Sequence, residues 1–228
     1  MANVVDLRNV DKSYRGAVDT RVLFGINLAF EQGSFNSIVG ESGSGKSTLL
    51  NIIGTLDRPT AGELWLEGRP TSLLNSNKMA ELRNRSIGFV FQSHYLLPEF
   101  SAMDNVLMPQ LIGNRRVDHS VRKRAEELFD LMGIARVRNN MANKMSGGQQ
   151  QRTAIARALM NNPRIFLADE PTGNLDSENT AVIYRIFRDV NRQFGTTFII
   201  VTHDRRIAEQ TDRIVEIKDG RIVMDLLR

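Results

Sequence analysis

Gly40-Glu41-Ser42-Gly43-Ser44-Gly45-Lys46-Ser47, early in this 228-residue chain, has the phosphate-loop spacing of glycine, four residues, then glycine-lysine-serine. An apolar run over residues 35–39 precedes it, and an apolar run with helical spacing over residues 48–53 follows it. This order of strand, loop and helix is the context that the spacing requires. A glycine-rich turn with a chance lysine is the alternative, and the flanking runs argue against it.

Such a loop binds phosphate for physical reasons. Glycines let the backbone approach a triphosphate and turn N–H groups toward it, and the positive end of the following helix favours negative charge. Lys46 can reach the β- and γ-phosphates, and the Ser47 hydroxyl can join Mg²⁺. The residues of this segment expected to bind the cofactor are Gly40, Ser42, Gly43, Ser44, Gly45, Lys46, Ser47 and Thr48.

A second motif ends another apolar run. Residues 165–168 predict a buried strand, and Asp169 and Glu170 follow it. A parallel sheet brings the carboxyl ends of its strands to the ligand crevice. Asp169 can then hold Mg²⁺, directly or through water, and Glu170 can polarise the attacking water as a general base. By itself the motif also fits an acidic loop after a core strand; together with the phosphate loop it indicates a nucleotide site.

A third motif, Ser146-Gly147-Gly148-Gln149, opens a predicted helix and has the composition of a second anion site. One chain would then carry two phosphate-binding elements. We expect two chains to meet head to tail, so that each ATP lies between the phosphate loop of one chain and this segment of the other. A plain helix cap by Ser146 is the alternative.

The rest of the chain alternates strands with helices, which predicts an α/β fold with a mainly parallel sheet. Strands are expected at residues 4–10, 22–30, 35–39, 63–67, 87–91, 165–168 and 197–201, with two more near Ile214 and Ile222. Helices are expected at residues 48–53, 78–85, 101–111, 121–132, 147–160 and 177–194. Tyr14-Arg15-Gly16 is expected to form a turn.

Residues 94–160 differ from the rest of the chain, because only helices and loops, and no strand, are expected there. Ser101 and Asp104 have the spacing of a capping box, and Gly133 is a suitable helix end. We therefore expect a single domain, with a core of residues 1–93 and 161–228 and a helical insert at about 94–160.

Composition limits the function classes. At 41% hydrophobic residues the chain can bury a proper core, and no apolar stretch approaches the roughly 18 residues of a membrane span. No N-terminal signal pattern is visible, and there are no cysteines, so we expect a location in the cytosol or on the cytosolic side of a membrane.

The net charge of +4 does not predict a nucleic-acid partner. Arg122, Lys123 and Arg124 are followed by Glu126 and Glu127, so opposite charges meet on one helix face. Aromatic residues do not interleave with the basic ones, as a groove for single strands would require. A solvated helix face is therefore the expected explanation of these charges.

Taken together and in this order, the motifs resemble those of ATP-binding cassette (ABC) transporter ATPases over essentially the whole chain. The resemblance implies a P-loop NTPase fold with a mainly parallel core sheet, a small antiparallel β subdomain and an inserted helical subdomain. It implies that ATP and Mg²⁺ are the cofactors and that ATP is hydrolysed to ADP and phosphate. Residues 40–47 match the Walker A loop, and residues 165–169 match the Walker B strand.

The resemblance also gives roles to single residues. It implies that Glu170 is the catalytic glutamate and that His203 is the switch histidine that contacts the γ-phosphate. Gln92 matches the glutamine that senses Mg²⁺ and the membrane partner, and Tyr14 matches the aromatic that stacks on adenine.

Two further motifs match this family. Ser146, Gly147, Gly148 and Gln149 match its signature motif, in which Met145 stands where leucine is usual. This exchange conserves volume and should cost little. Asn174-Leu175-Asp176 matches the loop that crosses the dimer interface.

Phe91-Gln92-Ser93-His94-Tyr95-Leu96-Leu97-Pro98-Glu99-Phe100 most resembles the ATPase subunits of bacterial lipoprotein-releasing systems. The partners so implied are a second copy of the chain, bound with ATP, and LolC/LolE-like membrane subunits at the cytoplasmic face of the inner membrane. Residues 94–98 form an apolar cluster that is expected to be exposed and to receive a helix of the permease. The alternative is that this cluster folds back on the insert.

Other function classes share this chemistry. Macrolide-exporter-type ATPases are close relatives and stay an alternative. DNA-maintenance ATPases carry long coiled-coil arms between the two nucleotide motifs, whereas the insert here is short and lacks sustained heptads. Translation factors carry two tandem cassettes, and this chain has one. A binding module without turnover would not need Lys46, Asp169, Glu170 and His203 together.

Overall fold

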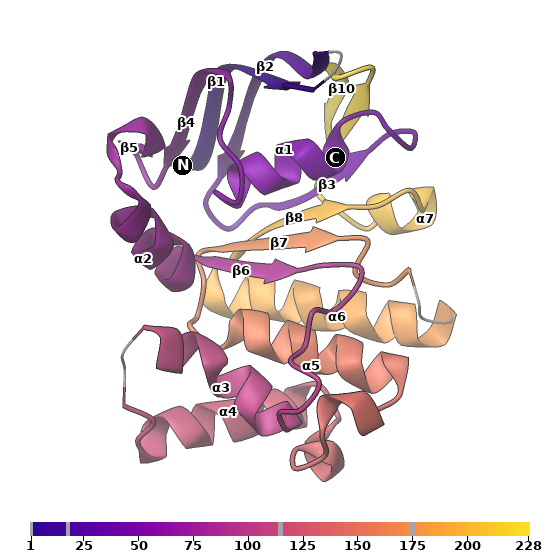
Figure 1. The fold of residues 1–228 in the computed structure, drawn as a ribbon. Coiled ribbons are helices and arrows are strands. Elements are labelled where there is room, and N and C mark those ends of the chain that lie inside the picture. Colours follow the sequence, from indigo (N-terminus) through magenta and orange to yellow (C-terminus); the bar gives the residue numbers. More distant parts are fainter. Residues whose placement is uncertain (1, 17–18, 114–115, 174–176) are drawn as a thin grey trace.

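The structure is a computed structural model that describes residues 2–16, 19–113, 116–173 and 177–228 (Figure 1). Its strands are β1 (Asn3–Tyr14), β2 (Thr20–Glu31), β3 (Phe35–Val39), β4 (Ala61–Leu66), β5 (Arg69–Pro70), β6 (Ile87–Val90), β7 (Ile165–Asp169), β8 (Thr197–Val201), β9 (Arg213–Lys218) and β10 (Arg221–Leu227). Its α-helices are α1 (Lys46–Ile53), α2 (Ser76–Ser86), α3 (Ala102–Ile112), α4 (His119–Leu131), α5 (Gly147–Leu159), α6 (Ser177–Phe194) and α7 (Arg205–Ala208). None of the helices within these ranges is long and apolar enough to pass through a membrane.

Two sheets organise the fold. The larger has the strand order β10-β9-β3-β8-β7-β6, in which only β10 runs antiparallel to its neighbour. The smaller has the order β2-β1-β4-β5 and is antiparallel throughout. The predicted mainly parallel sheet and the small antiparallel sheet are both confirmed.

The central strands bury both faces, and their side chains divide between two cores. In β7, Ile165 and Leu167 join the core around α1, while Phe166 and Ala168 join the core around α5 and α6. This division follows from the period of two in a strand, where successive side chains point to opposite faces. Helix α1 lies between the two sheets, so the helix that begins at the phosphate loop is held from both sides (Figure 1).

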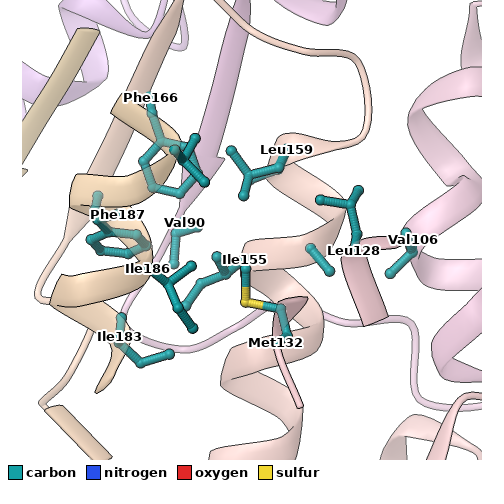
Figure 2. Packing of buried hydrophobic residues seen from close by; sticks show 14 of the residues in the cluster. Val90, Val106, Leu128, Met132, Ile155, Leu159, Phe166, Ile183, Ile186 and Phe187 are labelled. Carbon is teal, nitrogen blue, oxygen red and sulfur yellow. The ribbon is translucent and has the colours of Figure 1, made fainter. Parts of the chain in front are cut away.

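Helices α5 and α6 lie on the other face of the larger sheet, and α3 and α4 pack against α5 on the side away from the sheet (Figure 1). Figure 2 shows this core at close range. Phe166 of β7 lies near Phe187 of α6, and Ile155 of α5 belongs to the same cluster. The ring centroids of Phe166 and Phe187 lie 5.2 Å apart. Leu128 of α4 and Val106 of α3 extend the same cluster, which joins the helical segment to the sheet. Burial of such side chains supplies about 1.5–3 kcal/mol each.

Local sequence explains where the helices of this segment start. The Ser101 hydroxyl accepts the N–H of Asp104 at 3.1 Å, and the Asp104 carboxylate accepts the N–H of Ser101 at 3.1 Å. The predicted capping box is thereby confirmed, and α3 begins at Ala102. Gly133, just after α4, has a φ of 66°, which suits its predicted place at a helix end. Within residues 94–160, as far as they are described, the only β-type pairing is an isolated bridge between Ser101 and Met141.

Several boundaries differ from the sequence expectations. Tyr14 was expected in a turn, but it belongs to β1, because β1 pairs with β2 up to the pair of Tyr14 with Thr20. Strand β4 ends at Leu66, since Glu67 has a φ of 50°, outside the range of strands. The sequence did not predict β5 and α7, which are too short to show a period. The segment Asn174-Leu175-Asp176 lies outside the described residues.

Candidate functional site

The first group of predicted residues lies where parallel strands end. Strands β3, β8 and β7 are neighbours in the larger sheet and run in the same direction, so their carboxyl ends lie at one edge. Gly40 directly follows β3, Glu170 directly follows β7, and His203 comes two residues after β8. Chain segments far apart in the sequence are therefore brought to one place.

A cavity of about 510 Å³ opens at this edge. The predicted site residues that line it are Gly40, Ser42, Gly43, Gly45, Lys46, Ser47, Thr48, Gln92, Asp169, Glu170 and His203. Two further lining residues, Val22 of β2 and Val201 of β8, were missed at the sequence level. They carry no chemical signal, and only the fold brings them here. We call this space the first cavity.

The glycines of the loop are required by its backbone. Gly40 has a φ of 149°, and a Cβ atom there would lie 2.1 Å from the carbonyl oxygen of Ile217. Gly43 has a φ of 80°, which side chains disfavour, although the space around it is open. Glycine is thus required at residue 40 because a side chain would collide with the backbone of Ile217. At residue 43 it is favoured because the backbone has a positive φ.

Lys46 lies buried at the first turn of α1. Its ammonium group donates to the carbonyl oxygens of Gly40 at 2.8 Å and Glu41 at 2.7 Å. Both acceptors are neutral, and the first turn of α1 carries no acidic residue. The positive charge of Lys46 and the positive end of the helix therefore act together on an anion in the first cavity.

Glu170 and His203 form a close pair in the first cavity. The Oε1 atom of Glu170 lies 2.7 Å from Nδ1 of His203. The Glu170 side chain is 16% exposed and that of His203 is 74% exposed, so the carboxylate is the enclosed member of the pair. Glu170 has a φ of 48°, an uncommon value for a residue other than glycine, and its N–H donates to the carbonyl of Val201 at 3.0 Å. Its backbone is therefore held in place, and its carboxylate is hydrogen-bonded to His203.

The three side chains expected to meet Mg²⁺ line the same cavity. Ser47 comes from the start of α1, Gln92 from the segment after β6, and Asp169 from the end of β7. Mg²⁺ takes oxygen ligands, keeps several waters, and usually needs one or two carboxylates together with substrate phosphates. Among the described residues, no three or more His, Cys, Asp or Glu side chains gather as a metal cluster. This donor set fits Mg²⁺ that is bound jointly with a nucleotide.

Apart from Ser146 to Gln149, two predicted cofactor-binding residues, Ser44 and Tyr14, do not line the first cavity. The side chain of Ser44 is buried within the loop, and its backbone carbonyl accepts the N–H of Gly220 at 3.0 Å. Tyr14 lies at the end of β1, and its hydroxyl donates to the carboxylate of Asp57 at 3.0 Å. Ser44 therefore supports the loop from its buried side, through the bond to Gly220. The stacking of Tyr14 on adenine stays a prediction.

The residues Ser146 to Gln149 gather at a separate place. Ser146 caps α5: its hydroxyl accepts the N–H of Gln149 at 3.4 Å, and the Gln149 side chain accepts the N–H of Ser146 at 3.0 Å. Ser146, Gly148 and Gln149 line a second cavity of about 540 Å³, together with Arg152, whereas Gly147 does not. The two cavities share no lining residue. Ser146 is thus a helix cap, and the head-to-tail arrangement stays a prediction.

Helix α5 also holds the segment that follows Gln92, which the sequence did not reveal. The guanidinium of Arg157 donates to the carbonyl of Tyr95 at 2.6 Å and to that of His94 at 2.7 Å. His94 and Tyr95 have φ values of 53° and 45°, so their backbone is strained and needs such support. Burial holds the pKa of the Arg157 guanidinium below its usual range. An arginine on a largely buried helix was the available signal.

The same helix reaches the segment after Glu170. The side-chain amide of Gln151 is buried and donates to the carbonyl oxygen of Pro171. Burial also lowers the pKa of His94, and the neighbouring Gln151 side chain partly opposes this effect. Helix α5 therefore connects the segment after Gln92 with the segment after Glu170.

Comparison with known proteins gives the family. A family model described as ABC transporter matches residues 23–173, which is more than half of the chain. The chain belongs to the ABC transporter family. The α/β fold and the ATPase activity implied by the sequence motifs are confirmed: the chain is an ABC ATPase that binds and hydrolyses ATP.

Two curated relatives of this ABC ATPase match nearly its whole length. It is 51% identical over 224 residues to the lipoprotein-releasing system ATP-binding protein LolD 1 of Rhodopseudomonas palustris, with 97% of this chain and 99% of that protein covered. It is 50% identical over 222 residues to the lipoprotein-releasing system ATP-binding protein LolD of Anaeromyxobacter dehalogenans, with 97% and 93% covered.

A solved structure agrees with the fold of this ABC ATPase. The dimeric post-hydrolysis state of the ATP-binding cassette MJ0796 bound to ADP and Pi has a TM-score of 0.92 and 42% sequence identity, with 98% of each chain covered.

Proposed function

We propose that this ABC ATPase is the ATP-hydrolysing motor of a bacterial lipoprotein-releasing system. The observation that carries the proposal is the identity of 50% or more, over nearly the whole chain, to two lipoprotein-releasing ATP-binding proteins. The site supports the motor part, because Lys46, Asp169, Glu170 and His203 line one cavity.

The chemistry follows from the geometry of the first cavity. The phosphate loop and Lys46 hold the β- and γ-phosphates, and the carboxylate of Glu170 accepts a proton from the attacking water. The water oxygen then bonds to the γ-phosphorus as the bond to the ADP oxygen breaks. Nδ1 of His203 is hydrogen-bonded to Glu170, so Nε2 of the same ring is the atom that contacts the γ-phosphate. Held by Ser47, Asp169 and Gln92, Mg²⁺ would neutralise charge on the transferred phosphoryl group.

Two copies of the chain work together in this proposal. Ser146, Gly147, Gly148 and Gln149 of one copy bind the ATP that lies in the first cavity of the other, which explains why the two cavities are separate in one chain. The helix N-terminus at α5 supplies the second set of donors. The dimeric state of the MJ0796 cassette supports this assembly. We also propose that residues 1–93 and 161–228 form the core of one domain and that residues at about 94–160 form its helical subdomain.

The membrane partner is proposed to be a LolC/LolE-like permease at the cytoplasmic side of the inner membrane. Tyr95 is 65% exposed and Leu97 40% exposed, while His94 and Leu96 are partly buried. The apolar cluster of residues 94–98 is thus exposed only in part, and Leu96 packs on the core. Tyr95 and Leu97 form the proposed docking surface, because they are the exposed apolar side chains in the segment that begins at Gln92.

Catalysis is tested with Glu170→Gln. The amide keeps the shape of the carboxylate but accepts no proton, so phosphate release should fall by about 10²- to 10⁴-fold while ATP still binds. The variant should also accumulate as a dimer on a sizing column with ATP and Mg²⁺. A protein that stays monomeric under these conditions contradicts the two-copy arrangement.

The membrane partner is tested with Tyr95→Glu and Leu97→Glu. Charged side chains on this surface should abolish co-purification with co-expressed LolC/LolE-like subunits and leave the basal ATPase rate unchanged. Leu227→Glu, at a 77% exposed leucine of β10, is the matched control. Unchanged co-purification would remove this surface from the proposal, and capture of a macrolide-exporter-type permease instead would reassign the function.

A further inference from the structure

Three side chains from two distant segments of the chain, β1 and the segment after α1, meet next to the strand that carries Val22. Lys12 of β1 donates from Nζ to Oδ1 of Asp57 at 2.5 Å and to the carbonyl of Arg58 at 2.8 Å. The Tyr14 hydroxyl donates to Oδ2 of the same carboxylate at 3.0 Å. Each oxygen of Asp57 therefore accepts from one of the two β1 side chains. We call Lys12, Tyr14 and Asp57 the tyrosine clamp.

The charges of the tyrosine clamp are enclosed. Lys12 is only 8% exposed, and Asp57 is partly buried. Burial opposes ionisation of Asp57, but hydrogen bonds from Lys12, from the Arg58 backbone and from Tyr14 outweigh it and hold the pKa of Asp57 below its usual range. The carboxylate is therefore charged at neutral pH. Hydrogen bonds to a charged group are shorter and stronger than neutral ones, so Tyr14 has a firm anchor.

The ring of Tyr14 is held at its face as well as at its hydroxyl. The ammonium of Lys12 lies 4.8 Å from the ring centroid, within the range of a cation–π contact. Tyr14 nevertheless keeps 43% of its surface exposed. A ring fixed by two contacts and still accessible is a ready platform for a flat partner, because stacking then orders no further rotamer.

The tyrosine clamp is tied to the phosphate-binding elements. In β2, Val22, which lines the first cavity, lies between Leu23 and Arg21, and these two residues pair with Lys12 and Ser13 of β1. Asp57 lies just after α1, and its N–H donates to the carbonyl of Asn51 in that helix at 3.3 Å. Helix α1 begins at Lys46. The clamp therefore links the end of this helix to the strand that carries the tyrosine.

We propose that Asp57 and Lys12 are positioning residues for the nucleotide base, which act by fixing the ring of Tyr14 beside the first cavity. This inference rests on the proposed nucleotide site and names what orders its base-binding end. A nucleotide with a planar base gains from the clamp, whereas inorganic triphosphate, which has no base, does not.

The test compares ATP with inorganic triphosphate as calorimetric ligands of the full chain. Tyr14→Phe deletes only the hydroxyl, and Asp57→Asn removes the charge at nearly constant shape. Each should raise the Kd for ATP about three- to tenfold and leave the Kd for triphosphate unchanged. The double variant should be no weaker than Asp57→Asn alone, since both changes act through one bond. Asp6→Asn, at an aspartate of β1 that pairs with Arg8, is the control.

The outcomes separate this inference from the proposed site. If Tyr14→Ala weakens ATP but Tyr14→Phe and Asp57→Asn do not, the clamp has no positioning role. If Asp57→Asn weakens triphosphate as much as ATP, Asp57 acts through α1, and the inference is overturned. If Tyr14→Ala leaves ATP affinity unchanged, no base stacks on Tyr14, and that part of the proposed site fails together with the clamp. Should Asp57→Asn fold poorly, the ATP and triphosphate affinities of Tyr14→Phe suffice to decide between these outcomes.

Discussion

At the scale of single residues, the first cavity pairs an enclosed base with an exposed partner. Glu170 is enclosed and its backbone is held by Val201, whereas His203 is mostly exposed. Lys46 has three donor hydrogens, of which two bond to the carbonyls of Gly40 and Glu41. One hydrogen is left, so Lys46 serves both the shape of the loop and the charge of a bound phosphate.

Replacement of Lys46 by alanine should separate these two duties. Loss of a charged hydrogen bond to phosphate should weaken ATP binding about 10- to 100-fold in calorimetry, while the circular dichroism spectrum stays that of the parent. Lys218→Ala, at an exposed lysine that ends β9, should change neither. An ATP affinity equal to that of the parent would refute the assignment of this loop.

At the scale of elements, α5 contacts two segments that adjoin the first cavity and also carries residues of the second cavity. Its start carries Ser146 and Gln149, its middle donates from Gln151 to Pro171, and its last turn carries Arg157, which supports the backbone of residues 94–95. A movement of α5 would therefore be felt in the segments after Gln92 and after Glu170.

Two substitutions at Ser146 should distinguish its role as a cap from its role toward a second copy. Ser146→Asp keeps a good N-cap, so urea denaturation should give the parent's unfolding free energy. Its negative charge would oppose the phosphates of the other copy, so ATP-dependent dimers and hydrolysis should both be lost.

Ser146→Ala is the counterpart. Loss of the cap should lower the unfolding free energy by about 1 kcal/mol. If Ser146→Asp still dimerises with ATP and hydrolyses it at the parent's rate, the serine is a cap and nothing more.

At the scale of the whole molecule, an ion pair joins the last strand, β10, to its neighbour β9. Arg213 of β9 donates to both oxygens of Asp225 of β10, at 2.7 and 2.6 Å. These hydrogen bonds hold the pKa of Asp225 below its ordinary value of 3.8, although burial opposes the shift. A carboxyl whose pKa is lower in the folded chain stabilises the fold above the ordinary pKa and loses this effect as pH falls toward the folded value.

The unfolding free energy should therefore fall as pH drops below about 4. Urea denaturation at pH 7, 5, 4 and 3 measures this, and Asp225→Asn should give a smaller fall over the same pH range. Asp130→Asn, at an exposed aspartate of α4, should keep the fall of the parent. A variant at Asp225 with the parent's full pH dependence would contradict the assignment.

The sequence predicted the parts of this molecule whose roles are set by near neighbours. The phosphate loop, the capping box at Ser101 and the apolar strand before Asp169 each depend on residues a few positions apart, and all three were recognised. The motifs also predicted that Gln92, Asp169, Glu170 and His203 meet the phosphate loop, and they line one cavity with it. Contacts between distant segments outside these motifs were not predicted, because no local spacing records them. Asp57 lies 43 residues from Tyr14, and Arg157 lies 62 residues from Tyr95. Both contacts exist only once the sheets and helices have packed.

In the proposed two-copy arrangement, the cap at Ser146 affects how fast two copies can close on ATP. A hydroxyl oxygen can accept one hydrogen bond while its own hydrogen is donated elsewhere. Here the oxygen accepts from the N–H of Gln149, which holds the side chain in one rotamer before any second chain arrives. The hydroxyl hydrogen stays available to a phosphate oxygen, and no torsional entropy need be lost at contact. Closure can then proceed as rapidly as two rigid surfaces meet, without a search among serine conformations.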